Sequence, residues 1–231
     1  MEVPSDEPYS QEAWPQAQKN HAAMITRMDR DIGRLLDKLR ELGIDENTIV
    51  FFSSDNGPHQ EGGGNPFFFN SSGGLRGFKR SLHEGGVRVP MIVRWPGHVP
   101  AGQTNPHVWA FWDFLPTACE LAGIARDAPK DIDGMSVVPT LLQKGKQKTH
   151  EFLYWEFHEK AFQQAVRMGD WKAVRKSQGT PLELYDLAKD VSEEKNIAEQ
   201  HPDVIARIEA YLKTARSESE FWPKKMGKKK E

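Results

Sequence analysis

The residues with the clearest capacity for chemistry directly follow a strand-like run of apolar residues. Residues 48–54 read Thr-Ile-Val-Phe-Phe-Ser-Ser, a β-branched and aromatic stretch that predicts a buried strand. Asp55 and Asn56 come next, in the sequence Asp-Asn-Gly-Pro. Ligands of open α/β sheets bind beyond the carboxyl ends of strands, and carboxylate and amide oxygens suit calcium or magnesium. A simple Asp-Asn-Gly turn without a metal is the alternative interpretation.

A long glycine-rich loop, residues 57–86, follows this turn and carries a cluster of basic side chains. Its basic residues toward the end are Arg76, Lys79, Arg80 and His83. A compact ammonium such as that of Lys79 binds an anionic oxygen as a point charge. A solvated basic loop, with Glu84 and Arg88 as structural ion partners, is the competing interpretation. Loops of this length in a compact domain are usually functional or disordered.

The elements around the loop must position these side chains. Apolar residues recur at spacings of three and four from Ile25 to Leu42, which predicts a helix that Gly43 ends. Residues 89–95 predict a second strand, and Asp113 is placed to cap a helix that runs to residue 122. Helices that alternate with strands predict an α/β domain with a parallel or mixed sheet.

The C-terminal third has a different pattern. It contains four short strand-like runs separated by turn residues, namely 152–157, 163–167, 171–176 and 182–187. These runs predict an antiparallel meander, which an amphipathic helix over 202–215 follows. We therefore divide the chain into an α/β region (1–150), a small α+β subdomain (151–218) and a disordered Lys-rich tail (219–231).

Composition excludes several classes of protein. The 231 residues carry a net charge of -2, so there is no overall basic character to indicate nucleic acid binding. With a mean hydropathy of -0.66, the chain has no apolar stretch near the ~18–20 residues that a membrane span requires. Cys119 is the only cysteine, which excludes an intramolecular disulfide. The first nine residues are acidic and lack the basic and apolar regions of a secretory signal.

Several motifs combine into a recognisable pattern. They are Ser-Ser-Asp-Asn-Gly-Pro (53–58), Lys79 followed five residues later by Glu-Gly-Gly-Val-Arg-Val-Pro (84–90), Trp-Pro-Gly (95–97), Asp-Phe-Leu-Pro-Thr (113–117) and Gly-Asp-Trp-Lys (169–172). Together they resemble the C-terminal half of the formylglycine-dependent sulfatases, the arylsulfatase-type branch of the alkaline-phosphatase-like superfamily. The resemblance implies part of an alkaline-phosphatase-like mixed or parallel sheet sandwiched by helices, followed by a small α+β subdomain.

The resemblance also implies roles for individual residues. In that family the Asp-Asn pair completes an oxygen-ligand site for Ca²⁺, less often Mg²⁺, beneath the sulfate group, which implies Asp55 and Asn56 as metal ligands. Lys79 corresponds to the catalytic lysine that contacts the sulfate and its bridging oxygen. Arg76, His59 and His83 are candidate substrate-binding residues. For the two histidines, a polar surface position remains the alternative.

One essential part of the family pattern is missing. The family nucleophile is a formylglycine hydrate made from a C/S-x-P-S/T-R motif, and no such motif occurs in these 231 residues. Cys119 lies in Cys-Glu-Leu-Ala-Gly, inside an expected helix, and is interpreted as a buried core residue. We therefore expect a fragment of a sulfuric ester hydrolase, inactive alone, with formylglycine only in a missing N-terminal part.

Two other functions remain open. A zinc phosphodiesterase or phosphatase of the same superfamily would usually have an Asp-His-Gly ligand pair where this chain has Asp-Asn-Gly. A non-catalytic binding or accessory domain would explain the missing nucleophile. The family implies a sulfate ester as the partner, such as a sulfated glycan, and a periplasmic, extracellular or lysosomal location. The sequence does not identify the substrate or the oligomeric state.

Overall fold

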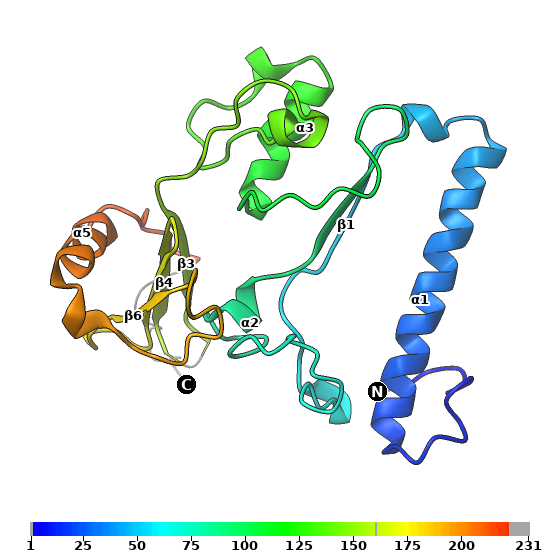
Figure 1. The fold of residues 1–231 in the computed structure, drawn as a ribbon, viewed down its shortest axis with the longest axis horizontal. Helices are drawn as coiled ribbons and strands as arrows, with labels where there is room; N and C mark the ends of the chain where they lie inside the picture. Colours follow the sequence, from blue (N-terminus) through cyan, green and yellow to red (C-terminus); the bar gives the residue numbers. More distant parts are fainter. Residues whose placement is uncertain (1, 160, 222–231) are drawn as a thin grey trace. The chain divides into compact units, whose positions relative to one another are not determined.

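The computed structural model describes residues 2–159 and 161–221, and the chain divides into two compact units (Figure 1). Unit 1 comprises Met1–Ser54, Glu61–Gly64 and Pro90–His150. Unit 2 comprises Asp55–Gln60, Asn65–Val89 and Glu151–Glu231. The division at residues 150 and 218 expected from the sequence stays a prediction. The expected tail lies outside the described residues from position 222 onward.

Unit 1 begins with the long helix α1, Gln16–Glu41, shown in blue in Figure 1. Lys38 and Arg40 in its last turn complement the helix dipole, and Gly43 has the positive φ of 67° that ends many helices. The predicted helix and its stop are therefore confirmed. Its apolar stripe is largely exposed within the described chain, since Leu35 is 68% exposed.

The two predicted strands of unit 1 pair with each other. β1, Val50–Ser53, and β2, Met91–Arg94, are antiparallel, with Val50 opposite Arg94 and Ser53 opposite Met91. The prediction that the first strand is buried is wrong, because all four of its residues are only half-buried. A sheet of two strands offers few neighbours to cover either face.

Short helical segments complete unit 1. They are η1 (Asp45–Asn47), η2 (Glu61–Gly63), η3 (Phe111–Asp113), α3 (Phe114–Leu121), η4 (Ala125–Asp127) and α4 (Val138–Leu142). The predicted capping role of the Asp113 side chain is wrong. Its carboxylate is fully buried, accepts the N–H groups of Ala110 and Met135, and lies 2.8 Å from His150 Nε2. Cys119 is half-buried, not a buried core residue as predicted.

Unit 2 contains the predicted meander and helix. After α2 (Glu84–Val87) come β3 (Leu153–Phe157), β4 (Gln163–Met168), β5 (Trp171–Arg175), β6 (Glu183–Asp186), η5 (Ala198–Gln200) and α5 (Pro202–Leu212). The four strands form one antiparallel sheet in chain order, and each pairs with the next. The meander and the final helix are confirmed in position.

The two faces of this sheet pack against different parts of unit 2. One face buries Val166, Ala173 and Leu184 against Ile208 of α5, which Figure 1 shows beside the sheet. Because side chains alternate along a strand, the next residues point to the opposite face. That face packs Ala165, Val174 and Tyr185 against Leu82 of the long loop. The loop with the candidate site residues is thus part of a hydrophobic core.

No helix among the described residues is long and apolar enough to cross a membrane.

Candidate active site

Two segments that carry the sequence-predicted site residues lie side by side in unit 2. Residues 55–60 contain Asp55, Asn56 and His59, and residues 76–86 contain Lys79. The backbone N–H of Lys79 donates to the carbonyl of Pro58 at 2.8 Å, and the N–H of Gly57 donates to the carbonyl of Gly86 at 3.0 Å. These two hydrogen bonds place the Asp-Asn turn against the loop that carries Lys79.

Glycine is required where the two segments meet. A Cβ on Gly57 would lie 1.9 Å from the carbonyl oxygen of Gly85, and a Cβ on Gly85 would lie 2.3 Å from that of Gly77. Both distances are far below van der Waals contact with backbone atoms that cannot swing away. The Asp-Asn-Gly and Glu-Gly-Gly motifs therefore fit each other through their glycines, a physical reason for two patterns that the sequence showed only as a resemblance.

The loop of Lys79 is closed at its base. The N–H of Gly85 donates to the carbonyl of Arg76 at 2.8 Å. This hydrogen bond joins the two ends of the loop. Lys79 lies between these ends and is half-buried, while Asp55 is exposed and Asn56 and His59 are half-buried. The two adjoining segments thus carry all six predicted site residues, and of these six only His83 is buried.

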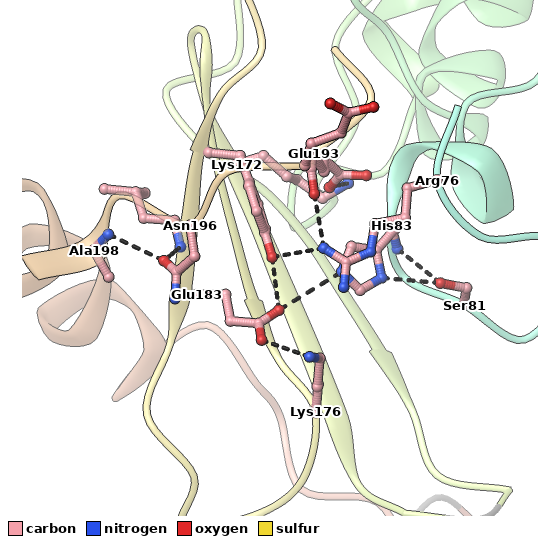
Figure 2. A network of polar contacts seen from close by, with 12 residues as sticks. Arg76, Ser81, His83, Lys172, Lys176, Glu183, Glu193, Asn196 and Ala198 are labelled. Carbon is pink, nitrogen blue, oxygen red and sulfur yellow. Dashed lines mark hydrogen bonds and ion pairs between the residues drawn. The ribbon is translucent and has the colours of Figure 1, made fainter. Parts of the chain in front are cut away.

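Arg76 is half-buried, and its side chain contacts the sheet and the turn after β6. Its Nη1 donates to Tyr185 Oη at 2.9 Å. It also donates to the carbonyl oxygen of Glu193 at 2.7 Å (Figure 2). The Tyr185 hydroxyl in turn donates to Glu183 at 2.7 Å. Burial and this carboxylate raise the pKa of Tyr185, so the hydroxyl stays protonated. These contacts tie the start of the loop to the sheet.

His83, unlike Arg76, is buried instead of lining an open surface. Its Nδ1 lies 3.1 Å from Ser81 Oγ, and its Nε2 lies 3.8 Å from Glu183 Oε2, as Figure 2 shows. Burial lowers the pKa of His83 to about 4, and the positive charges of Arg76 and Lys172 add to the effect. The ring is therefore neutral at neutral pH. Substrate binding by Arg76 and His83 stays a prediction, and both have structural partners.

Beneath the loop, the sheet presents a row of polar side chains. Lys172 stands opposite Arg167 on one neighbouring strand and opposite Tyr185 on the other. Lys172 is fully buried, and its Nζ lies 2.7 Å from Glu84 Oε1. Arg167 lies 3.6 Å from the other oxygen of Glu84. This cross-strand row therefore contacts both ends of the loop, since Tyr185 binds Arg76.

Glu193 completes the buried cluster from the turn after β6. Its Oε2 accepts the backbone N–H of Glu84 at 2.6 Å, and its Oε1 lies 3.9 Å from Lys172 Nζ. Burial raises the pKa of Glu193 to about 7, although the charge of Lys172 opposes the shift. Glu193 also has a φ of 55°, in the left-handed region that residues other than glycine rarely adopt.

Sequence reasoning missed Glu193 and the role of Lys172. The interpretation of Glu84 and Arg88 as structural ion partners identified one real contact, since their side chains lie 3.7 Å apart. A usable signal existed for Lys172. It alternates with the apolar residues Trp171 and Ala173 in a predicted strand, which places it on the opposite face of the sheet from these two residues.

The donor set of the Asp-Asn turn fits a hard cation. Asn56 Nδ2 donates to the carbonyl of Gly57 at 2.9 Å, which distinguishes the amide nitrogen from Oδ1. Asp55 adds an exposed carboxylate. These are two oxygen ligands, where Ca²⁺ takes about 6–8. Among residues 2–159 and 161–221 there is no group of three or more His, Cys, Asp or Glu side chains that would hold a metal ion.

Two protein-family models match the chain. One described as Sulfatase matches residues 3–124, more than half of the chain. The chain belongs to the sulfatase family. A second model, described as N-sulphoglucosamine sulphohydrolase, C-terminal, matches residues 75–218. The two matches overlap across the loop of Lys79 and continue through the sheet of unit 2, which confirms the family predicted from the motifs.

Curated relatives are similar to part of the chain. N-acetylgalactosamine-6-sulfatase of Mus musculus is 34% identical over 155 residues, covering 64% of this chain and 28% of the relative. Steryl-sulfatase of Mus musculus is 37% identical over 155 residues, covering 66% of this chain and 24% of the relative. The chain thus spans about a quarter of the length of these sulfatases.

Solved sulfatase-like structures match the fold over more of the chain. Ps i-CgsB has a TM-score of 0.78 and 29% identity, covering 92% of this chain and 46% of that one. BT4656, solved in complex with its substrate D-glucosamine-2-N,6-O-disulfate, has a TM-score of 0.68 and 27% identity, covering 84% of this chain and 40% of that one. These likenesses confirm the predicted α/β, alkaline-phosphatase-like fold class.

The buried titratable groups predict opposing effects of pH on stability. Glu193 titrates near 7 in the folded chain instead of at 4.5, so the folded state holds the extra proton. Its contribution to the free energy of unfolding therefore falls as pH rises from about 4.5 to about 7. His83 titrates near 4 instead of at 6.5, so the unfolded state holds the extra proton. Its contribution rises from about pH 4 to about 6.5.

Urea unfolding of three chains across this pH range separates the two effects. Relative to the unmodified chain, Glu193→Gln should gain stability with rising pH. The variant lacks the Glu193 carboxyl group, whose contribution to the free energy of unfolding falls as pH rises. His83→Asn should lose stability relative to the unmodified chain with rising pH. The variant lacks the His83 imidazole, whose contribution to the free energy of unfolding rises with pH. Parallel pH profiles for all three chains would show that neither group titrates as described.

Proposed function

We propose that this chain supplies the C-terminal part of the active site of a sulfatase. The observation that carries the proposal is the contact between the Asp-Asn turn and the loop of Lys79, made by the hydrogen bonds from Lys79 to Pro58 and from Gly57 to Gly86. It joins a pair of hard oxygen ligands to an ammonium side chain. A sulfate ester presents negative oxygens that both groups would bind.

The residues present have distinct parts in hydrolysis. Asp55 and Asn56 would hold Ca²⁺, and Mg²⁺ less readily; the cation would offset the charge of the sulfuryl oxygens. Lys79 would stabilise the negative charge that develops on the leaving oxygen as the sulfur–oxygen bond breaks. His59, half-buried on the same segment as the Asp-Asn turn, would contact the ester. Arg76 and His83 support the loop from below.

The nucleophile must come from outside these 231 residues. No C/S-x-P-S/T-R motif is present, and the half-buried Cys119 belongs to α3 of unit 1. We therefore propose that the chain alone does not hydrolyse sulfate esters and that turnover needs the polypeptide that bears formylglycine. The family and the oxygen ligand pair favour this function over zinc phosphodiesterase chemistry, because zinc prefers a histidine nitrogen where this chain has the amide of Asn56. A non-catalytic binding role would leave the active-site contact unexplained.

A sulfated glycan is the proposed substrate class. BT4656 binds a sulfated glucosamine, and Ps i-CgsB was solved with k-i-k-neocarrahexaose. In this chain, Phe67 is 73% exposed, and its ring meets that of Phe78 at a centroid distance of 6.2 Å. Phe78 directly precedes Lys79, so an exposed aromatic face lies near the proposed sulfate position and is available to pack against a sugar ring.

Replacement of Lys79 tests its role directly. In the complete enzyme, Lys79→Ala should lower turnover of a sulfate ester about 100- to 1,000-fold, as does loss of one preorganised charge-stabilising donor. Lys146→Ala, at an exposed lysine of unit 1, is the matched control and should leave turnover unchanged. Near-normal turnover of the Lys79 variant would make it an ordinary surface lysine.

Calcium binding is testable without turnover. The melting temperature of the complete protein should rise with added Ca²⁺, because a ligand at 100 times its Kd stabilises the folded state by about 2.7 kcal/mol. Asp55→Ala should abolish this shift, whereas Asp131→Ala, at another exposed aspartate, should preserve it. An unaltered shift in the Asp55 variant would refute the assigned ligand.

Phe67→Ala tests the glycan assignment. Loss of aromatic packing worth about 0.5–1.5 kcal/mol should raise KM for a sulfated oligosaccharide about 2- to 10-fold, with kcat little changed. Phe221→Ala removes another highly exposed ring, 87% exposed, and should have no effect. Equal KM values for the Phe67 variant and the unmodified enzyme would exclude the ring from substrate binding.

A further inference from the structure

The strongest unassigned feature of unit 2 is the buried charge cluster of Glu84, Lys172 and Glu193. Their exposures are 2%, 0% and 0%, and they come from α2, from β5 and from the turn after β6. Lys172 Nζ lies 2.7 Å from Glu84 and 3.9 Å from Glu193, while Glu193 also accepts the backbone N–H of Glu84. Lysine and glutamate are almost never fully buried unless they are paired.

The cluster has more charges around it than a single ion pair needs. Arg167 and Arg88 lie 3.6 Å and 3.7 Å from Glu84, and Lys172 Nζ lies 5.5 Å from the centre of the Trp155 ring. Such a network costs desolvation energy, so it is poor evidence for a purely stabilising role. The contacts of the network with the loop of Lys79 indicate a different role.

The cluster holds both ends of the loop that carries Lys79. At the start of the loop, the guanidinium of Arg76 donates to the carbonyl oxygen of Glu193 (Figure 2). At its end, Glu84 is held through its side chain by Lys172 and through its N–H by Glu193. Glu193 thus contacts both ends, from a backbone conformation that is rare for a residue with a side chain.

We propose that Glu84, Lys172 and Glu193 are positioning residues for Lys79: the C-terminal sheet fixes the proposed catalytic lysine by holding the two ends of its loop. This rests on the proposed function for the role of Lys79, but the holding of the loop does not. The cluster does not touch substrate. It acts through the loop backbone, whose tip meets the Asp-Asn turn at Pro58.

Amide hydrogen exchange on the 231-residue chain tests the holding of the loop. Glu84→Gln combined with Lys172→Met removes both members of the closest ion pair, which leaves Glu193 as the one buried carboxylate of the cluster. The N–H groups of Lys79 and Gly57 should exchange at least 10-fold faster in this double variant, while those of the sheet residues Val166 and Ala173 should stay protected. Glu209→Gln, which removes an ion pair with Arg175 on the same sheet, should leave the loop protected.

The single variant Lys172→Met should loosen the same loop amides further, because Glu84 and Glu193 then remain as buried carboxylates without their ammonium. If this single variant unfolds, the double variant still decides the question. Unchanged exchange at Lys79 and Gly57 in a folded double variant would overturn the proposal.

A mutant cycle in the complete enzyme tests whether the cluster acts through Lys79. The double variant should lower turnover at least 10-fold, and adding Lys79→Ala should produce no loss beyond that of Lys79→Ala alone. Losses that multiply would contradict a positioning role. A complete enzyme without sulfate ester turnover would refute the proposed function, while the exchange experiment would still decide whether the sheet holds the loop.

Discussion

The burial of Lys172 is the interaction on which the rest of unit 2 depends. An ammonium without access to water needs a negative partner, and Glu84 supplies it at 2.7 Å from a position 88 residues earlier in the chain. This requirement connects the C-terminal sheet to the loop that follows the Asp-Asn turn. Removing one partner would leave an uncompensated buried charge, at a cost of about 3–5 kcal/mol. The packing of Leu82 on the same face of the sheet reinforces the connection.

Through this connection, the small C-terminal sheet supports the loop of Lys79. One of its faces is covered by α5 and forms an ordinary apolar core. The other carries Arg167, Lys172 and Tyr185 in one row, and this row contacts Glu84 and Arg76. A sheet without predicted site residues thus supports the segment 76–86, which carries three of the six. The overlap of the two family models across residues 75–124 covers the same segment.

Local patterns were sufficient to predict the longer helices and the strands, but not short helices such as α2 and α4. The helix that Gly43 ends, the two strands of unit 1 and the four-stranded meander follow from spacing, turn residues and alternation, which act over a few residues. The same patterns were insufficient for Asp113, whose carboxylate accepts the N–H groups of Ala110 and Met135 and lies beside His150 instead of capping α3. A cap motif describes neighbours along the chain, whereas burial brings in partners from elsewhere.

The roles of the candidate site residues stay predictions, and the structure adds their contacts. Asp55, Asn56 and Lys79 were predicted from motifs, and the structure explains the motifs by the close backbone contact between Gly57 and Gly85. Arg76 and His83 were predicted to bind substrate because loop position was the only information available. Their contacts with Tyr185, Glu193 and Ser81 depend on pairings across the fold that no local pattern contains. Glu193 lies 109 residues from its partner Glu84 for the same reason.

The most direct test of the account is crystallographic. Diffraction from the complete protein with Ca²⁺ and a bound sulfate ester, with the cation identified by its anomalous signal, would show the site itself. The account predicts oxygens of Asp55 and Asn56 at about 2.3–2.6 Å from the cation, with the ammonium of Lys79 within hydrogen-bonding distance of the sulfate. A cation bound elsewhere, or a sulfate that Lys79 does not contact, would contradict it.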